Sequence, residues 1–130
     1  MANRARDWLR QAREEALWMA DSRTSERWAL VCFMAQQIAE KSLKAIGMSR
    51  GADQIKSHSI REIALALDID GNLTEKAKIL DQYYITTRYP DAFYSGSPFE
   101  YFTRDQADQA IGFARDFLER AEAEIAGDEG

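Results

Sequence analysis

The sequence has little of the chemistry on which most metal and cofactor sites depend. Its 130 residues include one cysteine and one histidine, too few for a zinc site built from these side chains within one chain. Cys32 has no partner for an internal disulfide, and in the apolar run WALVCFMA we expect it to pack as a small hydrophobic side chain. No P-loop, GxGxxG fingerprint or nucleophile elbow occurs. We therefore predict no metal and no cofactor, and we expect a reducing, cytoplasmic setting.

Long apolar runs and an excess of positive charge are also missing. No stretch approaches the roughly 18 apolar residues of a membrane-spanning helix, and the N-terminus MANRARDWLRQAR lacks the apolar centre of a signal peptide. The net charge of −5 argues against binding of duplex DNA. Residues 41–61, however, carry five cations and one acid, whereas residues 100–130 carry nine acids and three arginines. The basic segment is either an anion-attracting patch or an ordinary solvated surface.

What is present is helical periodicity, which predicts an all-α domain. The second of the predicted helices is apolar on most sides and should be central and buried. Thr24 or Ser25 should cap its start and Gly47 should end it. Short links between helices favour an up-and-down bundle of about five helices, forming one domain over residues 1–126 with a frayed tail at 127–130. The predicted helices cover about residues 3–20, 25–46, 57–67, 72–89 and 103–126.

Several polar residues interrupt the apolar pattern. Glu40 and Lys44 on the second helix are spaced as an i,i+4 ion pair. If this pair is drawn inward, Arg88 is the natural further partner for Glu40, because a guanidinium binds a carboxylate in a bidentate manner. His58, at the start of the third helix, could pack, cap the helix or bind an anion there.

Residues 83–96, YYITTRYPDAFYSG, gather aromatics, an arginine and one of two prolines. Pro90 should end the fourth helix at or before Tyr89. An arginine at such an end, beside aromatic rings, suits phosphate binding and base stacking. The alternative is an ordinary helix end, where Arg88 meets the helix dipole and Asp91 caps the loop. The candidate nucleotide- or phosphate-binding residues are Arg88, Tyr89, Asp91, Lys44, Glu40 and His58.

Four segments in this order and spacing resemble a HEPN domain (higher eukaryotes and prokaryotes nucleotide-binding): FMAQQIAEKSLKAI, KSHSIREI, LDQYYITTRYPDA and EYFTRDQADQAIGFARDFL. The resemblance implies a helical bundle, a homodimer and, in prokaryotes, a minimal nucleotidyltransferase as partner, often in a toxin–antitoxin pair. It also implies a relation to metal-independent endoribonucleases, whose active site is an arginine followed after four to six residues by a histidine.

In this sequence the resemblance assigns the arginine position to Arg88 and the histidine position to Phe93, and no histidine follows residue 58. Phenylalanine cannot transfer the proton that RNA cleavage requires, and the tyrosines Tyr84, Tyr89 and Tyr94 are poor substitutes, since a phenol ordinarily has a pKa near 10. His58 could serve only if the fold brings it near Arg88.

We therefore expect a nucleotide- or RNA-phosphate-binding module that works with a nucleotidyltransferase and has lost the usual catalytic histidine. A tyrosine near the motif is also a candidate acceptor for a transferred nucleotide. The first alternative is an endoribonuclease toxin in which Arg88 acts with His58 or a tyrosine. The second is a purely structural homodimer in which Arg88 and Glu40 hold the bundle together.

Overall fold

The computed structural model describes residues 4–129, and over this range it contains helices and no strand. The all-α prediction is confirmed. None of the helices in this range is both long and apolar enough to cross a membrane. Residue 130, the end of the tail that we expect to be frayed, lies outside the described residues. The elements are α1 (Ala5–Thr24), α2 (Trp28–Ser49), α3 (Ile60–Ala66), α4 (Gly71–Asp81), α5 (Tyr83–Thr86), two 3₁₀ turns, η1 (Pro90–Ala92) and η2 (Pro98–Glu100), and α6 (Arg104–Glu129).

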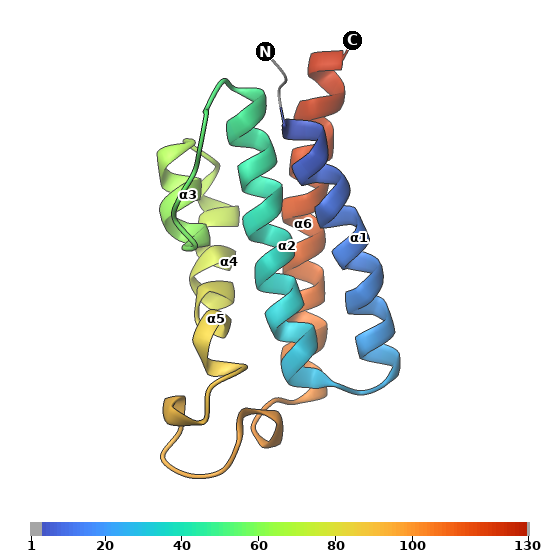
Figure 1. Cartoon of the computed structure of the whole chain (residues 1–130), viewed down its shortest axis with the longest axis vertical. Coiled ribbons are helices and arrows are strands. Elements are labelled where there is room, and N and C mark those ends of the chain that lie inside the picture. Colours follow the sequence, from blue (N-terminus) through green and yellow to red (C-terminus); the bar gives the residue numbers. More distant parts are fainter. Residues whose placement is uncertain (1–3, 130) are drawn as a thin grey trace.

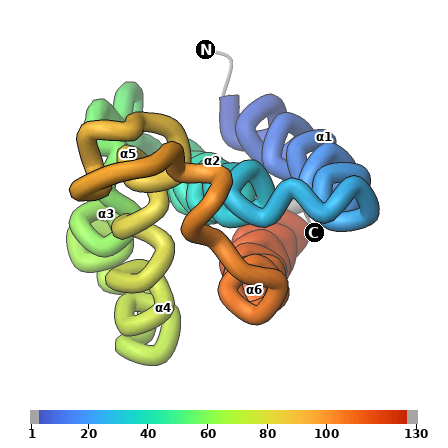
Figure 2. Tube along the Cα trace, turned by 90° about the horizontal axis from the view of Figure 1, so that it is seen from below, coloured from blue at the N-terminus to red at the C-terminus, as the bar shows by residue number. Residues whose placement is uncertain are grey.

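The second helix is central, as its apolar sequence predicts. In Figures 1 and 2, α2 lies between α1 and α6 on one side and the shorter helices α3, α4 and α5 on the other. Its buried residues include Cys32, and burial raises the pKa of that thiol to about 12, so the thiol stays protonated and inert. Four polar side chains of α2 are buried as well: Gln36, Glu40, Ser42 and Lys44. A buried polar group needs an internal partner. Gln36, Glu40 and Lys44 bond to one another, whereas the Ser42 hydroxyl has no hydrogen-bond partner among the described residues.

Side-chain caps mark the starts of α3 and α6. Helix α3 begins at Ile60, slightly later than the predicted start at about residue 57, and α6 begins at Arg104, close to the predicted start at 103. The Ser59 hydroxyl accepts a hydrogen bond from the Glu62 amide at 3.1 Å at the start of α3. At the start of α6, Thr103 and Gln106 form both bonds of a capping box, at 3.0 and 3.1 Å. The cap of α4 is Asp70, whose carboxylate accepts from the Leu73 amide at 3.0 Å, so this helix begins at Gly71, one residue before the predicted start.

Two predicted boundaries of α2 are wrong. The helix begins at Trp28 after the residue 25–27 turn, without a side-chain cap. Thr24 instead belongs to α1, where its hydroxyl donates to the Ala20 carbonyl. Gly47 does not end α2, which continues to Ser49. A Cβ at Gly47 would lie 2.3 Å from the Ile55 Cδ1 atom, so this glycine allows the following loop to pack closely against α2.

The predicted fourth helix is split. Between α4 and α5 the Gln82 amide bonds to the Ile79 carbonyl at 3.1 Å, a tightening of the helix to 3₁₀ geometry. The chain leaves α5 at Thr86, and Tyr89 adopts the extended backbone (φ −117°, ψ 120°) that a following proline imposes. Residues 88–103 then form the loop at the lower end of the bundle in Figure 1.

Candidate functional site

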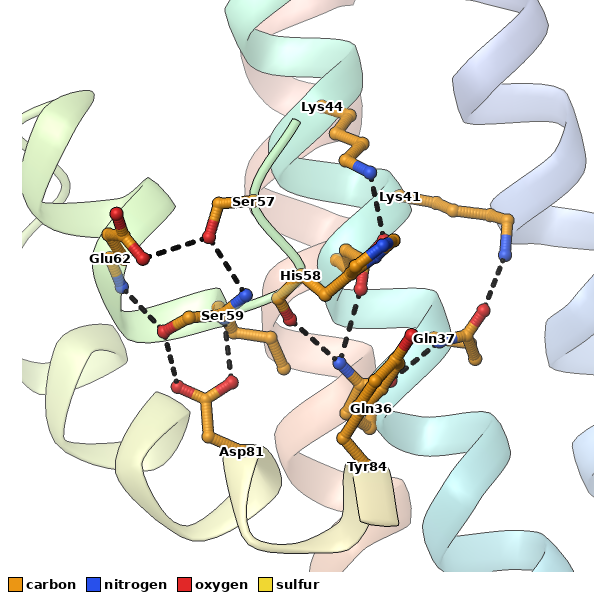
Figure 3. Close-up of polar contacts among 12 residues, drawn as sticks. Gln36, Gln37, Lys41, Lys44, Ser57, His58, Ser59, Glu62, Asp81 and Tyr84 are labelled. Carbon is orange, nitrogen blue, oxygen red and sulfur yellow. Dashed lines mark hydrogen bonds and ion pairs between the residues drawn. The ribbon is translucent and has the colours of Figure 1, made fainter. Parts of the chain in front are cut away.

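A buried carboxylate organises the polar face of α2. The Glu40 side chain is 5% exposed, and its Oε2 atom accepts from Lys44 Nζ at 2.9 Å and lies 3.1 Å from His58 Nδ1. Gln36 donates to Glu40 Oε1 at 3.3 Å and to the His58 carbonyl at 3.1 Å. Figure 3 shows Lys44, His58 and Gln36 converging on this point. Three of the residues that the sequence offers as separate candidates, Glu40, Lys44 and His58, are therefore neighbours.

The three differ in how accessible they are. The Lys44 side chain is 7% exposed, and its ammonium lies 5.3 Å from the Trp8 ring centre in addition to its ion pair with Glu40. An ammonium that is buried and already neutralised has little charge to offer an external phosphate. The His58 side chain, by contrast, is 57% exposed. His58 is thus the member of the cluster that a ligand could reach.

Asp81, at the end of α4, holds the His58 segment in place. Its carboxylate accepts from the Ser59 hydroxyl at 3.0 Å (Figure 3) and from the Ile60 and Arg61 amides at 2.7 and 3.0 Å. These bonds satisfy the first amides of α3 with a negative charge at the positive end of the helix dipole. The sequence prediction missed Asp81, because its partners are 20 to 22 residues away and no local pattern marks them.

Tyr84 links His58 to Arg88. The Tyr84 and His58 rings are stacked, with centres 5.3 Å apart and an interplanar angle of 14°. The Arg88 guanidinium carbon lies 4.9 Å from the centre of the same tyrosine ring. The fold therefore brings His58 and Arg88 to a common neighbour, which the sequence could not show.

Arg88 is anchored by rings and by a carbonyl. Its guanidinium carbon lies 4.4 Å from the Phe33 ring centre and 5.1 Å from the Tyr89 ring centre. Its Nε and Nη2 atoms donate to the Tyr84 carbonyl, one turn back in the chain. Within the part of the chain that the structure describes, Nη1 has no partner and no carboxylate lies within ion-pair distance of Arg88.

The expected ion pair between Arg88 and Glu40 is therefore not formed. Glu40 is satisfied by Lys44 and His58, and Arg88 by the Tyr84 carbonyl and three rings. The alternative in which Arg88 and Glu40 together hold the bundle is wrong in this respect, and Lys44 is the partner that neutralises Glu40.

The two other candidates on the loop lie at the surface. Tyr89 is 50% exposed, and its ring centre lies 5.1 Å from the Arg88 guanidinium carbon. Asp91 is exposed in η1, and its carboxylate bonds to none of the residues in the 4–129 range. Asp91 does not act as the loop cap that the ordinary helix-end interpretation requires.

The position at which the resemblance expects a histidine is a packing position. The Phe93 ring is stacked on Tyr101, with centres 4.2 Å apart and planes 8° apart, and meets Phe102 edge-on at 6.3 Å. Phe102 in turn packs edge-on against Tyr83 at 5.7 Å. These contacts fold the aromatic loop back onto the bundle. Tyr94, the neighbour of Phe93, points into solvent.

A groove of about 640 Å³ lies beside Arg88, between the turn that joins α1 to α2, the end of α5 and η2. The sequence prediction did not identify it, because its walls come from three separate segments. Among residues 4–129 no three His, Cys, Asp or Glu side chains are grouped as a metal site would need. The groove is lined by Ser25, Glu26, Arg27, Trp28, Ala29, Leu30, Phe33, Thr87, Arg88 and Phe99.

Comparison with known proteins agrees with this architecture. The HEPN domain family model matches residues 5–124. The crystal structure of TT1696 from Thermus thermophilus superposes with a TM-score of 0.90 at 40% identity, covering 94% of this chain and 98% of that one. The crystal structure of ST0689, an archaeal HEPN homologue, superposes with a TM-score of 0.82 at 31% identity, covering 95% and 99%. No curated protein sequence matches the chain.

Proposed function

The chain belongs to the HEPN domain family, and from that premise we propose that it is a nucleotide- or RNA-phosphate-binding module. It acts with a minimal nucleotidyltransferase partner, in a toxin–antitoxin-like or regulatory pair, and as a homodimer. The observation that carries the binding role is Arg88, an exposed guanidinium positioned by three rings and a carbonyl and unpaired with any carboxylate of residues 4–129.

The anchoring of Arg88 favours anion binding in two ways. Its Nε and Nη2 atoms are held by the Tyr84 carbonyl, so the side chain loses less conformational freedom when a ligand binds. Its Nη1 atom has no partner within residues 4–129 and is available to a phosphate oxygen. A guanidinium and a phosphate form short, charge-assisted hydrogen bonds. Tyr89 and Asp91, which are exposed and close to Arg88 in the chain, are the other loop residues that we place next to the ligand.

Calorimetric titration at low salt tests this role. Wild-type protein, Arg88→Ala and Arg115→Ala are titrated with inorganic phosphate, AMP and a short RNA. Arg115 is an exposed arginine of α6 and serves as a control for charge. We expect Arg88→Ala to weaken binding about tenfold or more, since a hydrogen bond to a charged group is worth about 1.5–3 kcal/mol. Equal binding by all three proteins would rule out the assignment of Arg88.

The usual ribonuclease reaction is not part of this proposal. Phe93 occupies the histidine position, and its ring is committed to Tyr101 and Phe102. A general acid or base for RNA cleavage needs a group that exchanges protons near neutral pH, which a phenylalanine lacks.

One observation favours a second candidate function, metal-independent RNA cleavage in which His58 replaces the missing histidine. His58 and Arg88 share Tyr84 as a neighbour, and Glu40 lies 3.1 Å from His58 Nδ1, as an orienting carboxylate would. Labelled RNA is incubated in EDTA with wild-type protein, His58→Ala and Arg88→Ala. Cleavage by the wild type that both variants abolish would establish this function, whereas intact RNA in the wild-type reaction would exclude it.

The partnership has its own test. Co-expression with a minimal nucleotidyltransferase encoded beside this chain, followed by affinity purification and sedimentation, is expected to give a stable complex that contains two copies of this chain. A monomer that does not co-purify with the nucleotidyltransferase would contradict both the homodimer and the partnership.

A further inference from the structure

The groove beside Arg88 has a second arginine in its lining. Arg27, in the turn before α2, is exposed, and within residues 4–129 its guanidinium has no ion-pair or hydrogen-bond partner. The one acid in the lining, Glu26, is already paired with Arg104, whose Nη2 lies 2.6 Å from its carboxylate. The unpaired charges that face the groove are therefore both positive, which fits a small anion rather than a neutral or cationic ligand.

The remaining walls are largely apolar. Leu30 is 42% exposed and Phe99 is 76% exposed, high values for side chains of this kind. Two of the aromatic rings already contact a cation. The Arg88 guanidinium carbon lies 4.4 Å from the Phe33 ring centre, and the Arg104 guanidinium carbon lies 4.9 Å from the Trp28 ring centre. Phe99 has no ring partner among the described residues, so its face is the one that a planar ligand can cover.

We infer that the groove binds the base of a free nucleoside 5′-monophosphate whose phosphate lies between Arg88 and Arg27. This inference rests on the proposed phosphate-binding role of Arg88 and extends it to a ligand class. The volume of about 640 Å³ lies within the range of small-molecule sites. Leu30 and Phe99 supply the apolar and stacking contacts that any base can use.

The distribution of positive charge favours a free nucleotide rather than an RNA strand as the ligand of the groove. A strand needs a basic track along its backbone, whereas this chain has a net charge of −5 and the groove offers two unpaired cations. Two guanidinium groups match the charge of one phosphate monoester at neutral pH.

Titration calorimetry with AMP and with ribose 5-phosphate isolates the contribution of the base. For the wild type we expect AMP to bind about tenfold more tightly, the scale of one base stacked on an aromatic ring. Phe99→Ala should reduce AMP affinity to that of ribose 5-phosphate without changing the latter. Arg27→Ala should weaken both ligands. Tyr94→Ala, an exposed loop aromatic outside the groove, and Arg115→Ala are the matched controls and should match the wild type.

Each alternative result is decisive. Equal affinity for AMP and ribose 5-phosphate, or no effect of Phe99→Ala, would overturn the base subsite while Arg88→Ala still reports on phosphate binding. If Arg88→Ala leaves both affinities unchanged, the proposed function fails instead. Binding of a tetra-adenylate more tightly than AMP would overturn the choice of a free nucleotide, and binding of neither ligand by the wild type would overturn both ideas.

Discussion

Replacement of Glu40 with glutamine should lower the stability of the protein by more than the small change in side-chain shape suggests. Glutamine keeps the volume but removes the charge, and it leaves the Lys44 ammonium, 7% exposed, without a counter-ion. Loss of one partner of a buried ion pair costs about 3–5 kcal/mol. For a domain of this size each kcal/mol lowers the melting temperature by roughly 3–5 °C, so a fall of roughly 10–20 °C is expected.

Urea and thermal unfolding at pH 7, followed by circular dichroism, measure this cost. The matched control is Glu75→Gln, which breaks an exposed ion pair in which Lys78 Nζ lies 2.8 Å from the Glu75 carboxylate. A surface pair of this kind should cost less than about 1 kcal/mol. In a second control, Lys44→Met is added to Glu40→Gln, and the double variant should be more stable than Glu40→Gln alone because no buried charge remains unpaired.

Two results would refute this reasoning. If Glu40→Gln is no less stable than Glu75→Gln, burial does not increase the contribution of the Glu40–Lys44 ion pair to the free energy of unfolding. If the double variant is less stable than Glu40→Gln, the unpaired ammonium is not the cause of the destabilisation. Lost packing is then the cause.

Three further predictions concern a cap, the loop and an ion-pair network. Asp81→Ala should lower stability by about 1–2 kcal/mol and speed hydrogen exchange of the amide of Ile60, since the carboxylate that accepts from the first amides of α3 is lost; unchanged exchange would contradict this. Phe93→His restores the arginine–histidine spacing but should give no cleavage of labelled RNA in EDTA, because the side chain at 93 packs inward on Tyr101; cleavage would show that position 93 faces the site. The hydrogen bond from Arg50 lowers the pKa of Glu124, so this carboxylate stabilises the fold above its ordinary pKa of about 4.3 and loses that effect as the pH falls through its lowered value. The stability difference between wild type and Glu124→Gln should therefore shrink below about pH 4, and a constant difference would argue against the ion pair.

The helices could be predicted because their signals are local. The apolar pattern of α2 predicts a buried central helix, and Thr103 with Gln106 predicts the start of α6 from residues three apart. Gly47 misled the prediction because its role depends on Ile55, in the loop after the helix, rather than on the helix itself. Glycine marks a helix end only when no neighbouring side chain needs its space.

The candidate site was harder to predict because its contacts cross between elements. Sequence spacing identifies the pair Glu40 and Lys44, which lie one helical turn apart. It cannot decide whether His58 or Arg88 completes that pair, since this depends on how the 51–59 loop and α5 pack against α2. The stacking of His58 on Tyr84 is likewise a tertiary contact without a local signal.

The most direct test of the central claim is an NMR titration that observes the Nε–H group of Arg88 while AMP is added. We expect a progressive shift of that resonance and of the amide resonances of Arg27 and Phe33, which line the groove. It would be contradicted if the Arg88 resonance stays unchanged at saturation, or if the shifts occur only around Trp8 and Gln54, which line a different groove.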